Sequence, residues 1–500
     1  METAASAQSA HNVAGILAGK NPLAPAIIDP ETSLNYRQLK QAIAGARTWL
    51  LEQGLTKSDR LALSLPNVWQ MPVLYYAALS LGVIVVTLNP LLSAREVSYH
   101  LQDSGSRLLV GWPGSRLEKE RQAVQAKTRI YFLRQTPWQP ADPDWTAEPV
   151  TLDQPALLLY TSGTTGRPKG AVLTHRNLTS NASSCAQVFG FTSEDRIFGG
   201  LPFFHAFGQT VAMNAALAAG ASVSLLARFT AQAASALCRA SGVSVLAAVP
   251  SMYAAIAAYL DSNPEQDLGK AVRFGISGGA PLPASIHRDF DRLLGCPIYE
   301  GYGLSETSPV VSFNQEKFGL VIGSVGRAIP GVKVSIRNQQ GQPLPAGQIG
   351  QLWVAGENVM AGYWNNPQAS QDAFDGDWFA TGDLARSDEH GNIYLVDRMK
   401  DVILRNGYSV YPREIEEVID SHPQVAQVAV VGKPHPLVGE EIWAFVLART
   451  ELTAAKEAEL IDQLDQLCQT QLAAYKYPRS FSLVTRMPLG PTGKILKDQL

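Results

Sequence analysis

One segment, residues 160–170, limits what this chain can fold into more than any other part of the sequence. It holds three glycines, four serine or threonine hydroxyls and two cationic side chains, and it directly follows the apolar run 156–159. Glycines let the backbone turn its N–H groups toward an anion, and hydroxyls and a lysine add donors. Residues 173–177 lead towards a helix. We therefore expect a strand, a polyphosphate-binding loop and then a helix.

This loop is not a Walker A motif. Pro168 and Lys169 follow Arg167, whereas that motif needs Gly-Lys-Ser/Thr after four spacer residues. A polar surface turn is the alternative interpretation. The residues expected to contact phosphate are Thr161, Ser162, Gly163, Thr164, Thr165, Gly166 and Lys169.

Length and composition indicate a globular protein of two or more domains. A chain of 500 residues is too long for one core, and 46% hydrophobic with 17% charged residues is ordinary. The net charge of −3 gives no electrostatic case for nucleic acid or an acidic membrane, while peripheral membrane contact stays open. The cysteines lack disulfide or metal-ligand spacing, which suits a reducing cytoplasm. They are Cys185, Cys238, Cys296 and Cys468.

Two segments bear on secretion and membrane insertion. Residues 1–25 lack a charged region followed by an apolar core, so no signal peptide is expected. Residues 71–88 are uncharged, but Gly82 interrupts them and β-branched residues follow it. A buried helix running into a buried strand explains this segment better than a membrane-spanning helix.

The order of apolar segments predicts an α/β fold. Residues 59–65 are typical of a strand, residues 66–67 of a helix start, and a second strand follows Gly82. Similar units recur at 191–226 and 241–278. We therefore expect a large N-terminal domain of mostly parallel sheets flanked by helices.

Two smaller parts are expected after this domain core. Short alternating segments with Gly and Pro turns predict an antiparallel β subdomain at about 323–397. A polar string at 398–401 then precedes a small α+β domain at 402–500. Residues 1–397 would form the N-terminal domain. Within the C-terminal domain we expect helices at 412–419 and near 453–473, and strands at 425–431 and 442–448.

A glycine-rich motif carries the candidate metal ligand. Its glycines allow the backbone to approach a nucleotide closely, and Tyr302 offers a face for adenine. Its last residues, Ser305 and Glu306, can reach phosphate and Mg²⁺, which takes few protein ligands. A strand end and turn with a solvated glutamate is the alternative. The motif consists of Glu300, Gly301, Tyr302, Gly303, Leu304, Ser305 and Glu306.

Two weaker motifs contain glycine turns. Gly278, Gly279 and Ala280 follow a strand-like segment, where glycines let a ligand lie against the backbone. Asp383 ends a Thr-Gly-Asp string, and a carboxylate that accepts two hydroxyl hydrogen bonds suits a sugar. Either motif taken alone is more often an ordinary turn.

Two further side chains are candidates for catalysis. His205 lies among aromatic residues, where a lone histidine is more often a core residue than a ligand. Lys494 lies on a Gly/Pro-rich loop. A lysine there could stabilise charge that develops on an α-phosphate, and a solvated surface lysine is the alternative.

Together these motifs resemble the signature sequences of the adenylate-forming enzymes, the superfamily of acyl-CoA synthetases, luciferases and peptide-synthetase adenylation domains. The resemblance covers about residues 25–500. It implies that ATP activates a carboxylate, which is then passed to a thiol. The small molecules it implies are a carboxylic acid, ATP, Mg²⁺ and coenzyme A.

The resemblance implies roles for single residues. Tyr302 would stack on adenine, Glu306 would hold Mg²⁺, and the 278–280 backbone would flank adenine and the acyl group. Asp383 and Arg398 would bind the ribose.

The remaining roles concern the acid and the thiol. His205 would line the carboxylate site, and Lys494 would be the catalytic lysine. Lys400 would be the hinge of a mobile C-terminal domain whose rotation brings Gly407 to the pantetheine tunnel.

The acid is expected to be apolar. Gly301 stands where malonate-activating relatives carry an arginine, which argues against a dicarboxylate. Residues 301–314 resemble bacterial long-chain fatty-acid–CoA ligases most, so a medium- or long-chain fatty acid is expected, with an aryl acid as the alternative. The expected pocket residues are Phe204, Phe207, Val211 and Gly279.

Two alternatives concern the reaction itself. An acyl carrier protein could replace CoA as acceptor, although the chain lacks an obvious extra insertion of the kind that acyl-AMP ligases carry. A non-catalytic acyl or nucleotide sensor is the other alternative. The presence of Lys494 and Glu306 argues against it, because a binding module needs neither.

Overall fold

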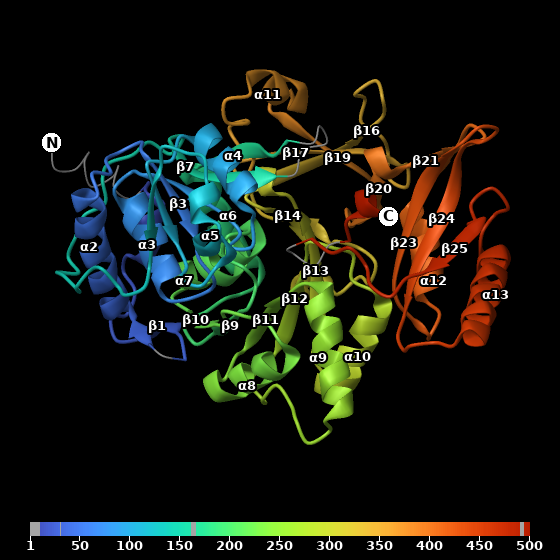
Figure 1. The fold of residues 1–500 in the computed structure, drawn as a ribbon, viewed down its shortest axis with the longest axis horizontal. Coiled ribbons are helices and arrows are strands. Elements are labelled where there is room, and N and C mark those ends of the chain that lie inside the picture. Colours follow the sequence, from blue (N-terminus) through green and yellow to red (C-terminus); the bar gives the residue numbers. More distant parts are fainter. Residues whose placement is uncertain (1–10, 31, 162–166, 491–494) are drawn as a thin grey trace.

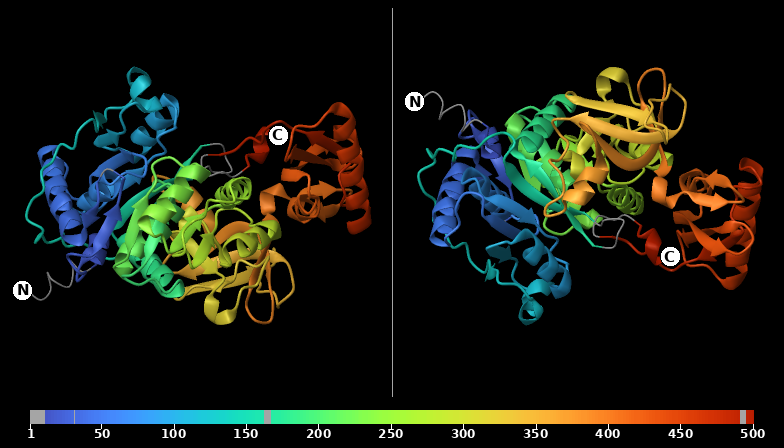
Figure 2. Two further views of the ribbon diagram at one scale, coloured as in Figure 1. Left: turned by 90° about the horizontal axis from the view of Figure 1, so that it is seen from below. Right: turned by 90° about the horizontal axis from the view of Figure 1, so that it is seen from above.

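The computed structural model of this chain describes residues 11–30, 32–161, 167–490 and 495–500. Two large sheets with helices against them form most of the molecule. A third sheet lies beside them, and the C-terminal part is set to one side (Figures 1 and 2). The predicted α/β class is confirmed. Six predicted site residues lie outside the described ranges, namely Ser162, Gly163, Thr164, Thr165, Gly166 and Lys494.

One large sheet has six strands in the order β6-β5-β3-β4-β7-β8. All neighbours in it pair in parallel except β7 and β8, which are antiparallel. Strands β4 and β5 are buried along their whole length, as expected for parallel strands covered on both faces. The strands are β3 (Arg60–Ser64), β4 (Ile84–Thr87), β5 (Leu108–Gly111), β6 (Arg129–Phe132), β7 (Pro155–Thr161) and β8 (Lys169–Thr174).

The other large sheet has nine strands in the order β15-β14-β13-β12-β11-β9-β10-β1-β2. Its six central strands, from β13 to β1, are parallel. The strands are β1 (Pro25–Ile28), β2 (Leu34–Asn35), β9 (Arg196–Gly199), β10 (Ser222–Leu225), β11 (Val245–Ala248), β12 (Phe274–Ser277), β13 (Ile298–Gly303), β14 (Val310–Phe313) and β15 (Arg327–Ala328).

Helices connect these strands, and most of them carry one buried face. The longer ones in this part are α2 (Tyr36–Glu52), α3 (Gln70–Ser80), α4 (Ala94–Ser104), α6 (His175–Val188), α8 (Ala231–Ser241), α9 (Pro250–Ser262) and α10 (Ala284–Leu294). A π-helical segment, η3 (Gly208–Ala215), leads into the short helix α7 (Ala216–Ala219). Two short elements, α5 (Arg116–Lys119) and η2 (Arg121–Ala123), precede β6.

The predicted βαβ units are present. Residues 71–88 form α3 and β4, and Gly82, with φ of 66°, makes the turn between them. Every residue of α3 after its first is buried, which explains its uncharged sequence. Within the described ranges, no helix is both long enough and apolar enough to span a bilayer.

The predicted helix start at residues 66–67 is wrong, because α3 begins at Gln70. Asn67 has a long-range role instead. Its side-chain amide donates to the carbonyls of Gly199 and Leu201 and accepts the Phe203 N–H. Asn67 therefore links the two large sheets.

The loop after β7 also differs from the prediction. Strand β8 follows it and pairs antiparallel with β7, so a strand and not a helix comes directly after the loop. The prediction that residues 173–177 lead towards a helix is confirmed, because α6 begins at His175 and Thr174 and Asn177 form its capping box.

A small antiparallel sheet follows the large ones. It pairs β16-β17-β19-β18, and β20 pairs with β19. Its elements are β16 (Val332–Arg337), β17 (Gly350–Gly356), α11 (Pro367–Ala373), β18 (Phe374–Asp375), β19 (Trp378–Ser387) and β20 (Ile393–Arg398).

The C-terminal part has its own sheet and its own buried core. Strands pair in the order β22-β21-β24-β23, and β25 pairs with β24. Helices α12 and α13 pack against each other. The elements are β21 (Ile403–Arg405), β22 (Tyr408–Val410), α12 (Pro412–Asp420), β23 (Val425–His435), β24 (Gly439–Ala448), α13 (Ala454–Gln471) and β25 (Ser480–Leu483).

A buried histidine at the start of α6 forms a hydrogen bond with the N-terminal segment of the chain. His175 is 1% exposed, and its Nδ1 accepts the Val13 N–H at 3.1 Å. Burial, together with the positive charge of Lys57, lowers the pKa of His175 to about 4. The imidazole is therefore neutral at pH 7.

We expect His175 to make folding stability depend on pH. Its folded pKa of about 4 lies below the unfolded value, which is about 6.5. As pH falls between these values, the unfolded chain binds the proton and the folded chain does not, so stability is lost. The loss from this group should reach about 2 kcal/mol at pH 5.

Urea unfolding of wild type and His175→Asn at pH 5 and pH 7 would measure this effect. The asparagine can still accept the Val13 N–H but does not titrate, so this part of the pH dependence should vanish. His390→Asn, on an exposed turn, is the control. Equal pH dependence in His175→Asn and wild type would contradict the expectation.

Candidate active site

The candidate site lies at the carboxyl ends of β12 and β13, which are parallel neighbours. Gly278 follows β12, and Gly301 lies within β13. A Cβ at Gly278 would stand 3.3 Å from the Phe207 ring and 3.6 Å from the Gly301 carbonyl oxygen. The close approach explains the glycine. The two motifs thus meet at the carboxyl ends of neighbouring parallel strands, which is where ligands bind in open α/β sheets.

Glu300 is buried within β13. It is 3% exposed, and its Oε1 accepts the Leu282 N–H at 2.9 Å. Burial raises the pKa of Glu300 to about 7, although the Leu282 hydrogen bond and the charge of Arg413 act in the opposite direction. Since Arg413 belongs to α12, the C-terminal part lies near this carboxyl. A nucleotide-binding role for Glu300 stays a prediction.

The two predicted ribose residues, Asp383 and Arg398, lie beside the predicted adenine residue Tyr302. The Tyr302 hydroxyl, on β13, donates to Asp383 Oδ2 at 2.5 Å. Arg398 Nε lies 3.3 Å from Asp383 Oδ1, because Asp383 and Arg398 are register partners on β19 and β20. The structure therefore brings these three predicted residues together around one carboxylate.

The candidate metal carboxylate is held by two hydroxyls. Glu306 lies in the short turn η4 (Ser305–Thr307), and its Oε1 accepts from Thr161 Oγ1 at 3.2 Å and from the Tyr363 hydroxyl at 3.0 Å. Lys169 Nζ lies 5.2 Å from the centre of the Tyr363 ring. Three predicted residues, Thr161, Lys169 and Glu306, thus meet around Tyr363.

This donor set fits Mg²⁺. Mg²⁺ takes one or two carboxylates and fills its shell with water and phosphate oxygens. Glu306 supplies one carboxylate, and Lys169 can neutralise phosphate beside it. Among the residues that the structure describes, no group of three or more His, Cys, Asp or Glu side chains could hold a metal ion. Only a site completed by the substrate would suit these side chains.

Sequence reasoning missed Tyr363 and Leu282. Tyr363 stands in a Gly-Tyr-Trp-Asn-Asn-Pro string, which by itself indicates only a turn. Its hydroxyl partner is 57 residues earlier in the chain. Leu282 contributes a backbone N–H, which no side-chain pattern can indicate.

His205 is suited to orient a carboxylate by hydrogen bonding. Its Nδ1 accepts the Phe207 N–H at 3.3 Å, which leaves Nε2 as the protonated nitrogen of the neutral ring. Burial lowers the pKa of His205 to about 4. Near pH 7 the ring can donate a hydrogen bond to an acid, but it carries no positive charge.

The predicted acyl-pocket residues lie at different depths. Phe207 is 6% exposed and packs on Gly278, while Phe204 is partly exposed. Val211 is 0% exposed, so no water-sized space reaches it in this structure. Gly279 has φ of 83°, where any side chain would strain the backbone.

The hinge and tunnel candidates lie in the C-terminal part. Lys400 lies in the turn η6 (Met399–Asp401), and its Nζ is 4.0 Å from Asp498. Gly407 is at the turn between β21 and β22, with φ of 81° and no atom within 4 Å of a Cβ built there. The structure does not bring Gly407 to the site.

The sequence matches a known enzyme family in two blocks. Residues 17–364 match the AMP-binding enzyme family, and residues 414–494 match the AMP-binding enzyme C-terminal domain. The chain belongs to the AMP-binding enzyme family. The second block begins within α12, so it covers most of the C-terminal part.

Relatives of this AMP-binding enzyme carry several names. A feruloyl-CoA synthase of an Amycolatopsis species is 34% identical over 482 residues, which is 96% of each chain. A long-chain-fatty-acid–CoA ligase of Mycobacterium tuberculosis is 33% identical over 499 residues, covering 96% of this chain and 95% of the relative.

A solved structure shows the same architecture. The ATP-bound crystal structure of MatB from Rhodopseudomonas palustris is 30% identical, covers 98% of both chains and has a TM-score of 0.88. The apo structure of the same protein, with equal identity and coverage, has a TM-score of 0.79. The arrangement of this AMP-binding enzyme is therefore more similar to the ATP-bound MatB structure than to the apo one.

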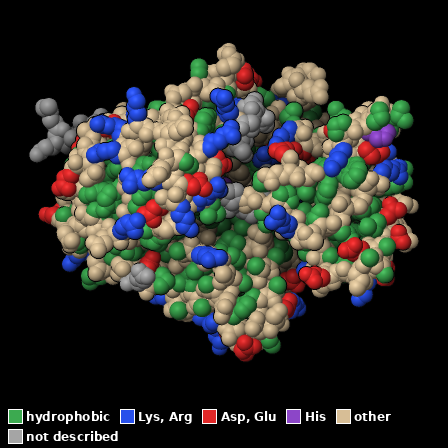
Figure 3. All heavy atoms as spheres, in the orientation of Figure 1, with side chains coloured by type: hydrophobic (Ala, Val, Ile, Leu, Met, Phe, Trp, Pro, Cys, Tyr) green, Lys and Arg blue, Asp and Glu red, His purple; other side chains and the backbone are tan. Residues whose placement is uncertain are grey.

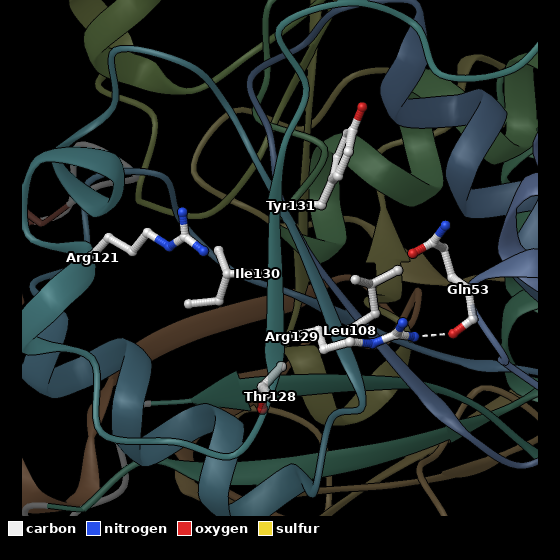
Figure 4. Close-up of a pocket in the computed structure, with 7 residues that line it drawn as sticks. All are labelled: Gln53, Leu108, Arg121, Thr128, Arg129, Ile130 and Tyr131. Carbon is white, nitrogen blue, oxygen red and sulfur yellow. Dashed lines mark hydrogen bonds between the residues drawn. The ribbon is translucent and has the colours of Figure 1, made fainter.

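A separate pocket of about 410 Å³ lies at the edge strand β6 (Figure 4). The guanidinium groups of Arg121 and Arg129 lie on opposite sides of β6 in this view, and Arg129 donates to the Gln53 carbonyl. The two cations do not converge on one anion. By contrast, Lys and Arg side chains gather along the boundary between the large and C-terminal parts (Figure 3).

We expect Asp383 to recognise the ribose hydroxyls of ATP. Hydrogen bonds to a charged group contribute about 1.5 to 3 kcal/mol, so Asp383→Asn should reduce the preference for ATP over 2′,3′-dideoxy-ATP by at least about tenfold. Calorimetric titration of both nucleotides into both proteins measures this preference.

Asp388→Asn is a matched control for this substitution. Asp388 accepts hydrogen bonds from Asn392 and Tyr394 on a turn of the same sheet. Its replacement should leave the preference unchanged. If Asp383→Asn weakened both nucleotides equally, Asp383 would not contact the sugar hydroxyls.

Proposed function

We propose that this AMP-binding enzyme is an acid–CoA ligase that forms AMP. ATP would adenylate a carboxylic acid, and the acyl group would then pass to the thiol of coenzyme A. One observation carries the proposal: Tyr302 on β13 contacts the predicted ribose residue Asp383, and Glu306, four residues later, contacts Thr161 and Tyr363 next to Lys169. The relatives named as CoA synthase and CoA ligase support the same reaction.

The chemistry assigns each group a task. A carboxylate oxygen attacks the α-phosphorus, the bond to the β-phosphate breaks, and pyrophosphate leaves. Lys169 and Glu306, the latter through Mg²⁺, would hold the leaving phosphates, which is most of what a protein contributes to phosphoryl transfer. Neutral His205 would orient the attacking acid. In the second step the thiol sulfur attacks the acyl carbon, AMP leaves, and the thiol proton passes to water.

For the acid, we propose a fatty acid of medium chain length. Phe204 and Phe207 offer apolar surface, and Val211 is completely buried. A long chain would need the Phe207 ring to turn away from Gly278. That ring also suits a flat partner, which makes an aryl acid the second candidate.

The test is pyrophosphate release and thioester formation with a panel of acids. The panel contains fatty acids of increasing length and benzoate and cinnamate types, each offered with CoA or a phosphopantetheinyl carrier protein. Turnover should be highest with medium-chain acids and CoA. If thioester formed faster with the carrier protein than with CoA, the carrier protein would be the acceptor. If no acid caused pyrophosphate release, the function would be that of a nucleotide-binding sensor.

We expect Phe207→Ala to shift acid preference towards longer chains. The deletion removes the ring that packs on Gly278, and enlarging a pocket favours larger ligands. The ratio of kcat/KM for long over medium acids should rise about tenfold, which corresponds to about 1.4 kcal/mol. An unchanged ratio would mean that the acyl tail runs elsewhere.

A further prediction separates the two half-reactions. Lys494→Ala should slow adenylation by about 2 to 4 kcal/mol, as expected for loss of a charge-stabilising donor, and spare thioester formation from supplied acyl-adenylate. Gly407→Leu should do the reverse. The two steps are measured by pyrophosphate release and by CoA thioester formation.

The control for Gly407→Leu is Gly391→Leu. Gly391 has the same φ of 81° on a turn with no neighbours within 4 Å of a built Cβ. It therefore carries the same backbone strain without the proposed role. If Lys494→Ala slowed both half-reactions equally, the two-orientation proposal would fail.

A further inference from the structure

A short segment, residues 360–364, lies between the two phosphate-binding elements of the candidate site. Its backbone pairs with β8: the Trp364 N–H donates to the Gly170 carbonyl, and the Val172 N–H donates to the Gly362 carbonyl. The Met360 N–H donates to the Glu306 carbonyl at 2.8 Å. The segment therefore joins the strand that leaves the phosphate loop to the turn that carries Glu306.

The same segment is anchored on its outer side. Trp364 Nε1 and the side-chain amide of Asn365 both donate to the Asp103 carbonyl at the end of α4. Tyr160 is the second-last residue of β7, directly before the phosphate loop, and its hydroxyl donates to the Asp103 carboxylate at 2.6 Å. Backbone contacts with β8 and with Glu306, and side-chain contacts with Asp103, therefore fix the position of residue 363.

Tyr363 uses this position to contact both ionic groups. Its hydroxyl donates to Glu306 Oε1 at 3.0 Å, and the face of its ring lies 5.2 Å from Lys169 Nζ. The Thr161 hydroxyl donates to the same carboxylate oxygen. The other carboxylate oxygen of Glu306, Oε2, accepts no hydrogen bond from any residue that the structure describes. Because both hydroxyls bind Oε1, Oε2 is the oxygen left to bind a ligand.

We infer that Tyr363 is a positioning residue that aims Glu306 at Mg²⁺ through its hydroxyl and holds Lys169 at the phosphates through its ring. The inference rests on the proposed function, since it assumes that Mg-ATP binds here. Cation–π contact restrains the lysine ammonium without neutralising it, and a hydrogen-bonded carboxylate keeps one geometry.

The test is calorimetric binding of ATP without acid or CoA, at increasing Mg²⁺ and in EDTA. Tyr363→Phe removes the hydroxyl and keeps the ring. The Mg²⁺ concentration that half-restores tight ATP binding should rise about three- to tenfold, as for one lost hydrogen bond, while metal-free ATP affinity stays at the wild-type value. Thr161→Val, which removes the other hydroxyl, should shift the same midpoint.

Tyr363→Leu separates the two contacts. It removes the ring as well, so metal-free ATP affinity should fall about two- to fivefold in addition, as for an exposed cation–π contact. Tyr394→Phe is the matched control, because its hydroxyl also binds a carboxylate, Asp388, away from the site. It should change neither quantity.

Each outcome decides the inference. An Mg²⁺ midpoint in Tyr363→Phe equal to that of wild type and Tyr394→Phe overturns it, as does an equal loss of affinity with and without metal. If Tyr363→Leu matches Tyr363→Phe, the Lys169 contact has no role. If wild type binds no ATP, or binds it independently of Mg²⁺, the proposed function fails and the inference with it.

Discussion

A buried hydrogen bond from Tyr302 to Asp383 joins the parts of the chain on which the site depends. Tyr302 belongs to the nine-stranded sheet and Asp383 to the small antiparallel sheet. Arg398, which pairs with Asp383, is the last residue of β20, directly before the turn with Lys400. A buried carboxylate is costly unless it is paired and hydrogen-bonded. These contacts therefore hold the small sheet against the large one and set where the C-terminal part begins.

Local patterns were enough to predict most of the fold. The turn from α3 to β4 was predicted because apolar residues give way to β-branched ones after Gly82. The strand β8 was not predicted, because its apolar run, residues 171–173, is too short to distinguish a strand from a helix start. Asn67 was misassigned since its hydrogen bonds go to residues more than 130 positions away.

The site was predictable by residue but not by pairing. Asp383 and Arg398 each stood out in a motif, and only the β19–β20 register makes them partners. Tyr363 had no such signal, because its importance comes from Glu306 and Lys169, which reach it from two other segments. The burial of single side chains could not be predicted either. Phe207 and Val211 are four residues apart, and of these two it is Phe207 that borders Gly278.

The boundary with the C-terminal part is polar, and this bears on whether that part can rotate. Asp397 accepts the N–H groups of Arg398 and Arg413, and burial raises the pKa of its carboxyl, as it does for Glu300 near the same helix. Both carboxyls lose hydration in this orientation. Water would replace their partners if α12 moved away, so much of the lost hydrogen bonding would be recovered.

The apolar cores, in contrast, are separate on the two sides of this boundary. Rotation would therefore expose little of either core. Interfaces of this polar kind leave domain motion as the default. The proposed presentation of two loops of one domain to one site would need orientations of similar free energy, and a polar boundary over intact cores is a physical way to obtain them.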